Sequence, residues 1–248
     1  MPTRQEDAEA YYREFWRRDG LDDWLHHRPR QEQLKLFVGA VLRGPDTRRI
    51  LDLGCGTGVM TDWLRTYGEA MGTDFSEPAI ELGRALAPRV ELHVQPLEDI
   101  QLDGDFDVIC AFDVIEHVPP PDRPALFGRI GTLLAAEGLI IVSTPHPRFS
   151  RWMAERRPEL MQVVDEPVDL RELVELAASA NAELIRYETF DINWRRQYQF
   201  AVFQGMVEVG SEPRINRALR LRLALRSNPI ARRLRRARIA ARLRRGGL

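Results

Sequence analysis

One nine-residue stretch constrains the fold more than any other part of the chain: Ile50-Leu51-Asp52-Leu53-Gly54-Cys55-Gly56-Thr57-Gly58. The four residues before the first glycine are largely apolar, which predicts a short buried strand. Glycine then occupies every second position, and a helical pattern begins directly after the last glycine. Because glycine has no Cβ, its backbone can approach a ligand closely. A strand, a glycine-rich turn and a helix in this order are typical of ligand sites in α/β folds.

The spacing of the glycines separates two kinds of site. A dinucleotide site needs glycine at the first, third and sixth positions of the turn, and the sixth position here is Val59. The sequence Leu-Asp-Leu-Gly-Cys-Gly-Thr-Gly instead resembles the first motif of class I S-adenosylmethionine (SAM) methyltransferases. The resemblance implies a SAM site that contains Asp52, Gly54 and Gly56. The alternative is a structural turn in another kind of α/β protein.

A second acidic residue, Asp74, lies 20 residues after the first glycine of the loop. It ends the segment 69–74, which we predict to be a second strand. A carboxylate at the end of this strand can accept hydrogen bonds from both ribose hydroxyls. It can alternatively cap the next helix, although Ser76 and Pro78 already supply a helix start. We place Asp74 and its neighbour Phe75 in the predicted cofactor site.

Strands and helices are predicted to alternate through the middle of the chain. The predicted strands are 48–53, 69–74, 90–95, 106–112 and 138–143, and the predicted helices are 58–67, 77–87 and 122–135. This order implies a parallel sheet with helices on both faces. A further helix near 169–180 and two alternating segments, 182–191 and 197–204, follow. The resemblance covers roughly residues 45–205 and implies a three-layer, Rossmann-like α/β fold whose seven-stranded sheet is mostly parallel, with an antiparallel last strand.

The remaining segments suggest a domain organisation around this core. Helical patterns at 4–19 and near 31–42 predict an N-terminal helical cap over residues 1–44, followed by a methyltransferase core at 45–210. Prolines interrupt residues 144–168, and an insertion at this position lies at the carboxyl edge of the sheet, where ligands bind. We interpret it as a substrate cap. Residues 211–248 form a separate arginine-rich tail.

The most informative stretch after the glycine loop is Asp113-Val114-Ile115-Glu116-His117-Val118. On one helical turn, Asp113, Glu116 and His117 would share a face because of their i, i+3, i+4 spacing. Two carboxylates and an imidazole can hold a divalent cation such as Mg²⁺. Alternatively, His117 acts alone as a general base without a metal, or the histidine is structural. Our candidate catalytic residues are His117 and Asp113.

This stretch resembles the Glu-x-x-Glu-His-Val motif of two methyltransferase families. One methylates catechol-type phenols in ubiquinone biosynthesis, and the other methylates the 2′-hydroxyl at the 3′ ends of small RNAs. Both use their acidic residues and histidine around a Mg²⁺-type ion. The first acidic residue here is Asp113 instead of glutamate, so its carboxylate is one methylene shorter. A Glu-His pair also occurs in many small-molecule methyltransferases that use no metal.

The resemblance implies further cofactor contacts. The loop after the third strand holds adenine in this class, which makes Leu97 and Glu98 candidates. Phe112 matches a position whose backbone faces the methionine part of SAM. His146, in the loop after the fifth strand, is a further candidate ligand, base or substrate contact.

Charge is distributed unevenly along the chain, although the net charge is −1. Residues 211–248 contain 13 of the 36 basic residues, all arginines, and one of the 37 acidic residues. Residues 1–210 therefore hold 23 basic and 36 acidic side chains, a balance of −13 against +12 for the tail. The tail can dock on the acidic domain of its own chain or of a second chain in a homodimer. It can also bind an anionic membrane surface or nucleic acid.

The location of the protein is predicted from features that the sequence lacks. No apolar run approaches the roughly 20 residues that span a membrane. The first residues do not resemble a signal peptide, and Cys55 and Cys110 form no Cys-x-x-Cys pair. We therefore expect reduced, buried cysteines in a cytoplasmic protein that the tail can hold at a membrane.

These observations favour a SAM-dependent methyltransferase that acts on a hydroxyl of a small molecule, such as a phenolic, quinone-like or sugar acceptor. The alternatives are an RNA 2′-O-methyltransferase, an N- or C-methyltransferase of a small metabolite, and a SAM-binding domain without turnover. The RNA alternative is opposed by the balance of −13 over residues 1–210, because acidic surfaces repel phosphates.

Overall fold

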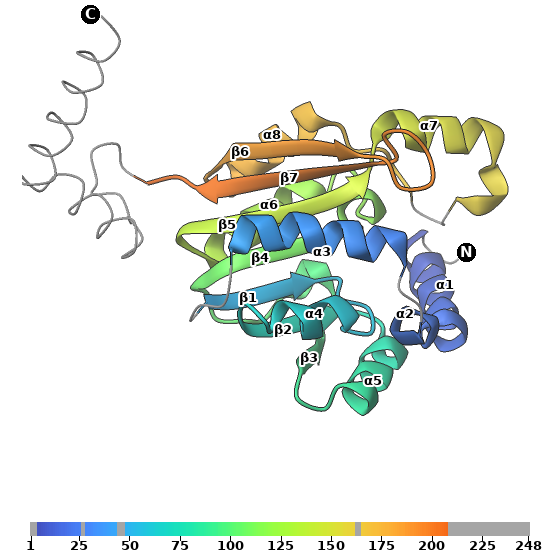
Figure 1. Cartoon of the computed structure of the whole chain (residues 1–248), viewed down its shortest axis with the longest axis horizontal. Coiled ribbons are helices and arrows are strands. Elements are labelled where there is room, and N and C mark those ends of the chain that lie inside the picture. The colour runs from blue at the N-terminus through green and yellow to red at the C-terminus, as the bar shows by residue number, and fades with distance from the viewer. Residues whose placement is uncertain (1–3, 26–27, 44–47, 162–164, 208–248) are drawn as a thin grey trace, which may run out of the picture. The chain divides into compact units, whose positions relative to one another are not determined.

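The computed structural model describes residues 4–25, 28–43, 48–161 and 165–207 (Figure 1). The tail predicted at 211–248 lies outside these residues. A seven-stranded sheet in the order β3-β2-β1-β4-β5-β7-β6 forms the centre of the fold. Its strands are β1 (Arg48–Leu53), β2 (Gly68–Asp74), β3 (Glu91–Val94), β4 (Phe106–Phe112), β5 (Leu134–Pro145), β6 (Ala182–Phe190) and β7 (Tyr198–Gly205). The pairs among β1 to β5 are parallel, and β7 is antiparallel to both β5 and β6, which confirms the predicted fold class.

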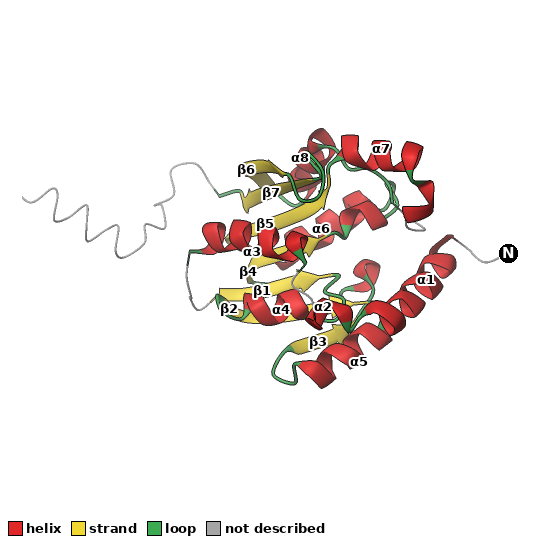
Figure 2. Cartoon of the chain, turned by 45° about the vertical axis from the view of Figure 1, so that its right-hand side comes forward, coloured by secondary structure: helices red, strands yellow, loops and turns green. Residues whose placement is uncertain are grey.

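Helices cover both faces of this sheet and one of its ends (Figures 1 and 2). The α-helices are α1 (Arg4–Asp19), α2 (Asp22–Leu25), α3 (Pro29–Leu42), α4 (Val59–Leu64), α5 (Glu77–Leu86), α6 (Arg123–Leu133), α7 (Pro147–Arg156) and α8 (Leu170–Ser179) in the described residues. Three short 3-10 turns accompany them there: η1 (Leu97–Asp99), η2 (Ile115–His117) and η3 (Pro158–Leu160). None of the helices within the described ranges is long and apolar enough to cross a bilayer.

The central strands are apolar along their whole length because both of their faces are covered. Along β4, Val108 and Cys110 pack in a cluster with α3 and α4, whereas Ile109 and Ala111 pack in a second cluster with α6 and α8. Successive residues of a strand point to opposite faces, so one continuous apolar run supplies both clusters. This arrangement gives the three layers that the alternating pattern predicts.

The element boundaries differ from the prediction most at β5. We expected a helix over 122–135 and a strand from 138, but the helix ends at Leu133 and the strand begins at Leu134. Leu134 pairs with Phe106 of β4, and the register shifts before Val108. Glu137 adopts a φ of 62° within this irregular start. Sheet pairing therefore overrides the helical preference of the alanines at 135 and 136.

The strand order creates a crevice at the carboxyl edge of the sheet. β1 lies between β2 and β4. After β1 the chain adds β2 and β3 on one side of it, and then crosses to add β4 and β5 on the other side. In α/β sheets this reversal point is where ligands bind. Figure 1 shows that α1, α2 and α7 lie at the end toward which β1, β4 and β5 point.

Candidate active site

The glycine loop has a backbone conformation that a side chain would disturb. Gly54 and Gly56 have φ values of 63° and 54°, in the left-handed region. A Cβ on Gly54 would lie 2.5 Å from Val114 Cγ2, and a Cβ on Gly56 would lie 2.6 Å from Trp16 Cη2. Both contacts are shorter than carbon atoms allow, so glycine is required at these positions for conformation and for space.

Asp74, at the end of β2, is bonded to this loop. Its Oδ2 accepts a hydrogen bond from the amide of Gly56 at 2.9 Å, and its Oδ1 accepts one from the amide of Ser76 at 2.8 Å. The side chain is buried, and this burial raises its pKa to about 6, although the two amides act in the opposite direction. Because each carboxylate oxygen has two lone pairs, each can accept one further hydrogen bond from a ligand.

Asp52, the acidic residue of the glycine motif, is also buried. Its Oδ2 accepts a hydrogen bond from Thr61 Oγ1 at 2.6 Å, which ties β1 to α4. Burial raises the pKa of Asp52 to about 7, while the Thr61 hydroxyl lowers it. Two acidic side chains therefore lie under the glycine loop in an environment that disfavours their charged forms.

A single cavity of about 930 Å³ brings the predicted site residues together. The predicted residues that line it are Asp52, Gly54, Gly56, Asp74, Phe75, Leu97, Glu98, Phe112, Asp113, Glu116 and His117. Tyr12, Phe15 and Trp16 of α1, which belongs to the predicted N-terminal cap, also line the cavity. The Tyr12 ring contacts Phe75 at 5.7 Å and His117 at 5.6 Å between centroids, so α1 lies against both of these cavity residues.

Asp113 does not share a helical turn with Glu116 and His117, so the predicted common face is wrong. Its φ is 57°, and its amide donates to Ser143 O at 2.8 Å, which extends the pairing of β4 with β5 by one residue. Its carboxylate forms an ion pair with Arg30 of α3. The same carboxylate accepts hydrogen bonds from Ser143 Oγ at 3.1 Å and Tyr198 Oη at 3.3 Å.

The predicted divalent cation site does not fit this geometry. Nowhere in the described part of the chain do three or more His, Cys, Asp or Glu side chains group closely enough to hold a metal ion. The carboxylate of Asp113 instead faces the Arg30 guanidinium, a cation that takes the place a metal would need. We therefore derive no chemical step through Mg²⁺.

Glu116, in η2, presents a buried carboxyl group to the cavity. The residue is 2% exposed, and its Oε2 has no hydrogen-bond partner among the residues that the structure describes. The pKa of Glu116 is raised to about 8, mainly by burial and also by the nearby Asp165, although Arg30 and Arg123 act in the opposite direction. The group is therefore mainly protonated at neutral pH and can donate a hydrogen bond to a bound molecule.

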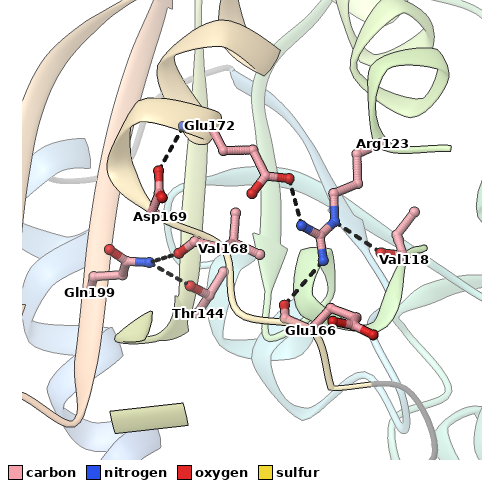
Figure 3. Close-up of polar contacts among 8 residues, drawn as sticks. All are labelled: Val118, Arg123, Thr144, Glu166, Val168, Asp169, Glu172 and Gln199. Carbon is pink, nitrogen blue, oxygen red and sulfur yellow. Dashed lines mark hydrogen bonds and ion pairs between the residues drawn. The ribbon is translucent and has the colours of Figure 1, made fainter. Parts of the chain in front are cut away.

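A buried arginine holds the wall of the cavity next to Glu116 (Figure 3). Arg123, 1% exposed, donates from Nε to Val118 O at 2.9 Å, from Nη2 to Glu166 O at 3.1 Å and from Nη1 to Glu172 Oε1 at 2.6 Å. The amide of Glu166 in turn donates to Glu116 O at 2.9 Å. One side chain of α6 thus joins η2, the segment 165–168 and α8.

Gln199 of β7 holds the segment 165–168 at Val168, two residues after the contact of Arg123 with Glu166. Its Nε2 donates to Val168 O at 2.6 Å and to Thr144 Oγ1 at 3.0 Å, as Figure 3 shows. Asp165, at the start of the segment, lines the cavity. The end of the predicted substrate cap is therefore a fixed wall of the cavity.

Several residues of the site are not among the predicted site residues. Arg30, Tyr198 and Asp165 line the cavity, and Arg123 supports its wall. No local pattern marks these residues, because they reach the site from α3, β7, the segment 165–168 and α6. His146 is not a lining residue; its Nδ1 accepts a hydrogen bond from the amide of Arg148 at 3.2 Å, so it caps α7.

A family model described as a methyltransferase domain matches residues 21–205 of the chain. The chain belongs to this methyltransferase family. The match covers the sheet, the glycine loop and η2, and it confirms the resemblance that the glycine spacing indicates.

Similar curated proteins are ubiquinone biosynthesis O-methyltransferases. One from Coxiella burnetii is 29% identical over 112 residues, which are 43% of this chain and 47% of the relative. One from Alkalilimnicola ehrlichii is 35% identical over 92 residues, which are 34% of this chain and 37% of the relative. The chain thus matches less than half the length of each of these relatives.

Solved methyltransferase structures share the fold. A magnesium protoporphyrin IX methyltransferase from Synechocystis PCC 6803, with bound SAH, matches with a TM-score of 0.61 at 15% identity, over 80% of this chain and 100% of that one. A TehB-like SAM-dependent methyltransferase from Corynebacterium glutamicum matches with a TM-score of 0.57 at 20% identity, over 80% and 98% of the two chains.

Proposed function

We propose that this methyltransferase uses SAM to methylate a hydroxyl group of a small molecule. The observation that carries the proposal is one cavity that is lined both by the glycine loop and Asp74 and by Glu116 and His117. A cofactor and an acceptor can meet in such a cavity without open solvent between them. Binding of both molecules in one cavity aligns the reacting groups, which is the main requirement of methyl transfer.

One group of cavity residues, which includes the glycine loop and Asp74, fits SAM. We assign Asp74 to the ribose hydroxyls because its buried oxygens each retain acceptor capacity. Leu97 and Glu98 of η1 are assigned to adenine, and Phe112 to the methionine part of the cofactor. SAM supplies an electrophilic methyl group on a positively charged sulfur.

A second group of cavity residues, which includes Glu116 and His117, fits a hydroxyl acceptor. A phenol, with a pKa of about 10, must lose its proton as it attacks. We propose that a ring nitrogen of His117 takes this proton as the general base. Glu116 holds a second polar group of the acceptor through its buried carboxyl, and Asp113, fixed by Arg30 and Tyr198, orients this side of the cavity.

The curated relatives support the O-methyl specificity, because their names specify O-methyl transfer in ubiquinone biosynthesis. A phenolic or quinone-like acceptor follows by analogy, and a sugar hydroxyl is the other acceptor class. The RNA alternative is disfavoured by the acidic balance of residues 1–210. The alternative of N- or C-methylation of a metabolite has no feature in its favour.

Transfer of label from methyl-labelled SAM to fractionated cell extract tests this proposal. We expect label in a small-molecule fraction, with a bond that has the chemical stability of an ether. The His117→Ala variant should bind SAM and transfer little label, while the Asp74→Ala variant should bind SAM more weakly. Label in RNA, sensitive to ribonuclease and to salt, would support the RNA alternative. Saturable SAM binding without label in any fraction would contradict an enzymatic role.

A further inference from the structure

Three aromatic side chains form an exposed cluster beside the cavity. Phe149 and Trp152 of α7 contact each other at 5.8 Å between ring centroids, and Trp194 contacts them at 5.6 and 6.3 Å. Trp194 lies in the loop 191–197 that joins β6 to β7, and Figures 1 and 2 show this loop next to α7. Trp152 is 41% exposed and Trp194 is 48% exposed. The rings of Trp152 and Trp194 are therefore exposed to solvent next to each other.

The two segments that carry this cluster are rich in arginine. Arg148 and Arg151 of α7 and Arg195 and Arg196 of the loop are all exposed. The two segments 147–157 and 191–197 together contain six arginines and two acidic residues. Residues 1–210 as a whole have a balance of −13, so this positive charge is a local exception. We call these aromatic and arginine side chains the aromatic-arginine face, and its charge complements an anionic partner.

The orientation of α7 separates a buried side from an outward side. Pro147 and Ser150 are buried against the core. Phe149 and Trp152, three residues apart, lie together on another side with the arginines beside them. Tryptophan favours the water–hydrocarbon boundary of a membrane, and arginine binds the phosphate groups there. This combination is typical of a helix that lies in a bilayer surface.

The loop 191–197 links this face to the cavity. Ile192, Asn193 and Gln197 line the cavity wall, while Trp194 from the same loop belongs to the aromatic-arginine face. Pro145, directly before α7, also lines the cavity. Contact between this face and a bilayer would therefore place the cavity next to the membrane surface.

We propose that the aromatic-arginine face docks the protein on an anionic lipid bilayer. The headgroups contact Arg148, Arg151, Arg195 and Arg196, and the rings of Trp152 and Trp194 enter the boundary between headgroups and acyl chains. The proposal depends neither on the acceptor nor on the tail, since all of these residues lie within the described core.

Tryptophan fluorescence of the full chain with vesicles of phosphatidylcholine and phosphatidylglycerol tests this proposal. Lipids brominated near the headgroup quench only tryptophans that enter the bilayer surface. We expect quenching in the wild type and in the control Trp63→Phe, which changes a partly buried tryptophan of α4 outside the cavity lining. The Trp152→Ser/Trp194→Ser variant should lose the quenching and bind vesicles about tenfold more weakly.

A second variant tests the charge. Arg148→Gln/Arg151→Gln should weaken binding about fivefold for each arginine at low salt, because each basic residue near an anionic surface contributes comparably. Vesicles of pure phosphatidylcholine should bind much more weakly. These two results would assign the binding to headgroup charge as well as to the rings.

Three outcomes would overturn the proposal. Absence of quenching in a wild type that still sediments with vesicles would assign membrane binding to the tail alone. Quenching that persists in the double tryptophan variant would show that other tryptophans enter the bilayer. Loss of RNA binding in that variant, without any vesicle binding by the wild type, would identify the face as a nucleic-acid surface.

Discussion

The carboxylate of Asp74 and the amide of Gly56 form a 2.9 Å hydrogen bond that joins the end of β2 to the glycine loop of β1. The same buried carboxylate therefore shapes the loop and faces the cavity. A change at Asp74 acts on the ligand directly and also through the position of the loop.

The Asp74→Ala variant should lose about 1–3 kcal/mol of SAM binding free energy, the usual effect of deleting a hydrogen bond to a charged group. Gly56→Val should also lose SAM binding, because its Cβ would meet Trp16 in a backbone region that valine avoids. Calorimetric titration measures both effects, with Asp62→Asn as a control acidic residue outside the cavity lining. Unchanged affinity in folded Asp74 and Gly56 variants would refute the cofactor assignment.

Glu116 should make folding stability fall as pH rises. Its folded pKa of about 8 lies above the ordinary glutamate value of 4.5 because of burial, so the folded state holds a proton that the unfolded state releases between these values. The stability therefore decreases from about pH 4.5 to pH 8. The Glu116→Gln variant has no carboxyl group to titrate, so its free energy of unfolding does not fall in this way. The difference in free energy of unfolding between the variant and the wild type should therefore shift in favour of the variant by on the order of 2–4 kcal/mol between pH 5 and pH 8. Denaturant unfolding at both pH values checks this, and a difference independent of pH would contradict it.

The His117→Ala variant should lower kcat by roughly 10²–10⁴, the usual contribution of a general base, while the Kd for SAM stays near the wild-type value. EDTA should leave wild-type turnover unchanged, because the described acidic residues and His117 do not form a metal cluster. His93→Ala, an exposed histidine paired with Glu91, is the control. Full activity of the His117 variant would make this histidine structural. Loss of turnover in EDTA with recovery in Mg²⁺ would restore the metal alternative.

Much of the fold could be predicted because its signals are local. The glycine spacing, the acidic residue at the end of β2 and the alternation of apolar segments each lie within a short stretch. The relation of Asp113 to Glu116 was predicted wrongly, since the pairing of Asp113 with Ser143 in a neighbouring strand ends the turn that spacing alone suggests. Arg30, Arg123 and Tyr198 are not among the predicted site residues, because their roles arise from contacts between distant elements.

Arg123 should affect acceptor binding more than cofactor binding. Arg123→Met removes the link between Val118 and Glu166 and leaves Glu172 without its partner, which should cost about 2–4 kcal/mol of stability. Because Glu166 contacts Glu116, the KM for the acceptor should increase by about tenfold or more while the Kd for SAM changes little. Arg123→Lys should recover part of both losses.

Steady-state kinetics with SAM and acceptor varied separately measure this effect of Arg123. The control is Arg49→Met, since Arg49 also donates to a backbone carbonyl, that of Gly104, and does not line the cavity. Equal changes of both constants in the Arg123 variants would mean that the arginine only supports the fold.

The arginine-rich tail, outside the described residues, should strengthen binding to anionic membranes. Its balance of +12 attracts an anionic surface, and each basic residue near such a surface contributes on the order of 1 kcal/mol. We expect the full chain to sediment with anionic liposomes more than a 1–210 truncation does, and about 0.5 M salt should weaken the binding by screening. The truncation should retain weaker binding through the aromatic-arginine face. Equal sedimentation of both forms would remove the membrane role of the tail and favour its docking on the acidic domain of the same or a second chain.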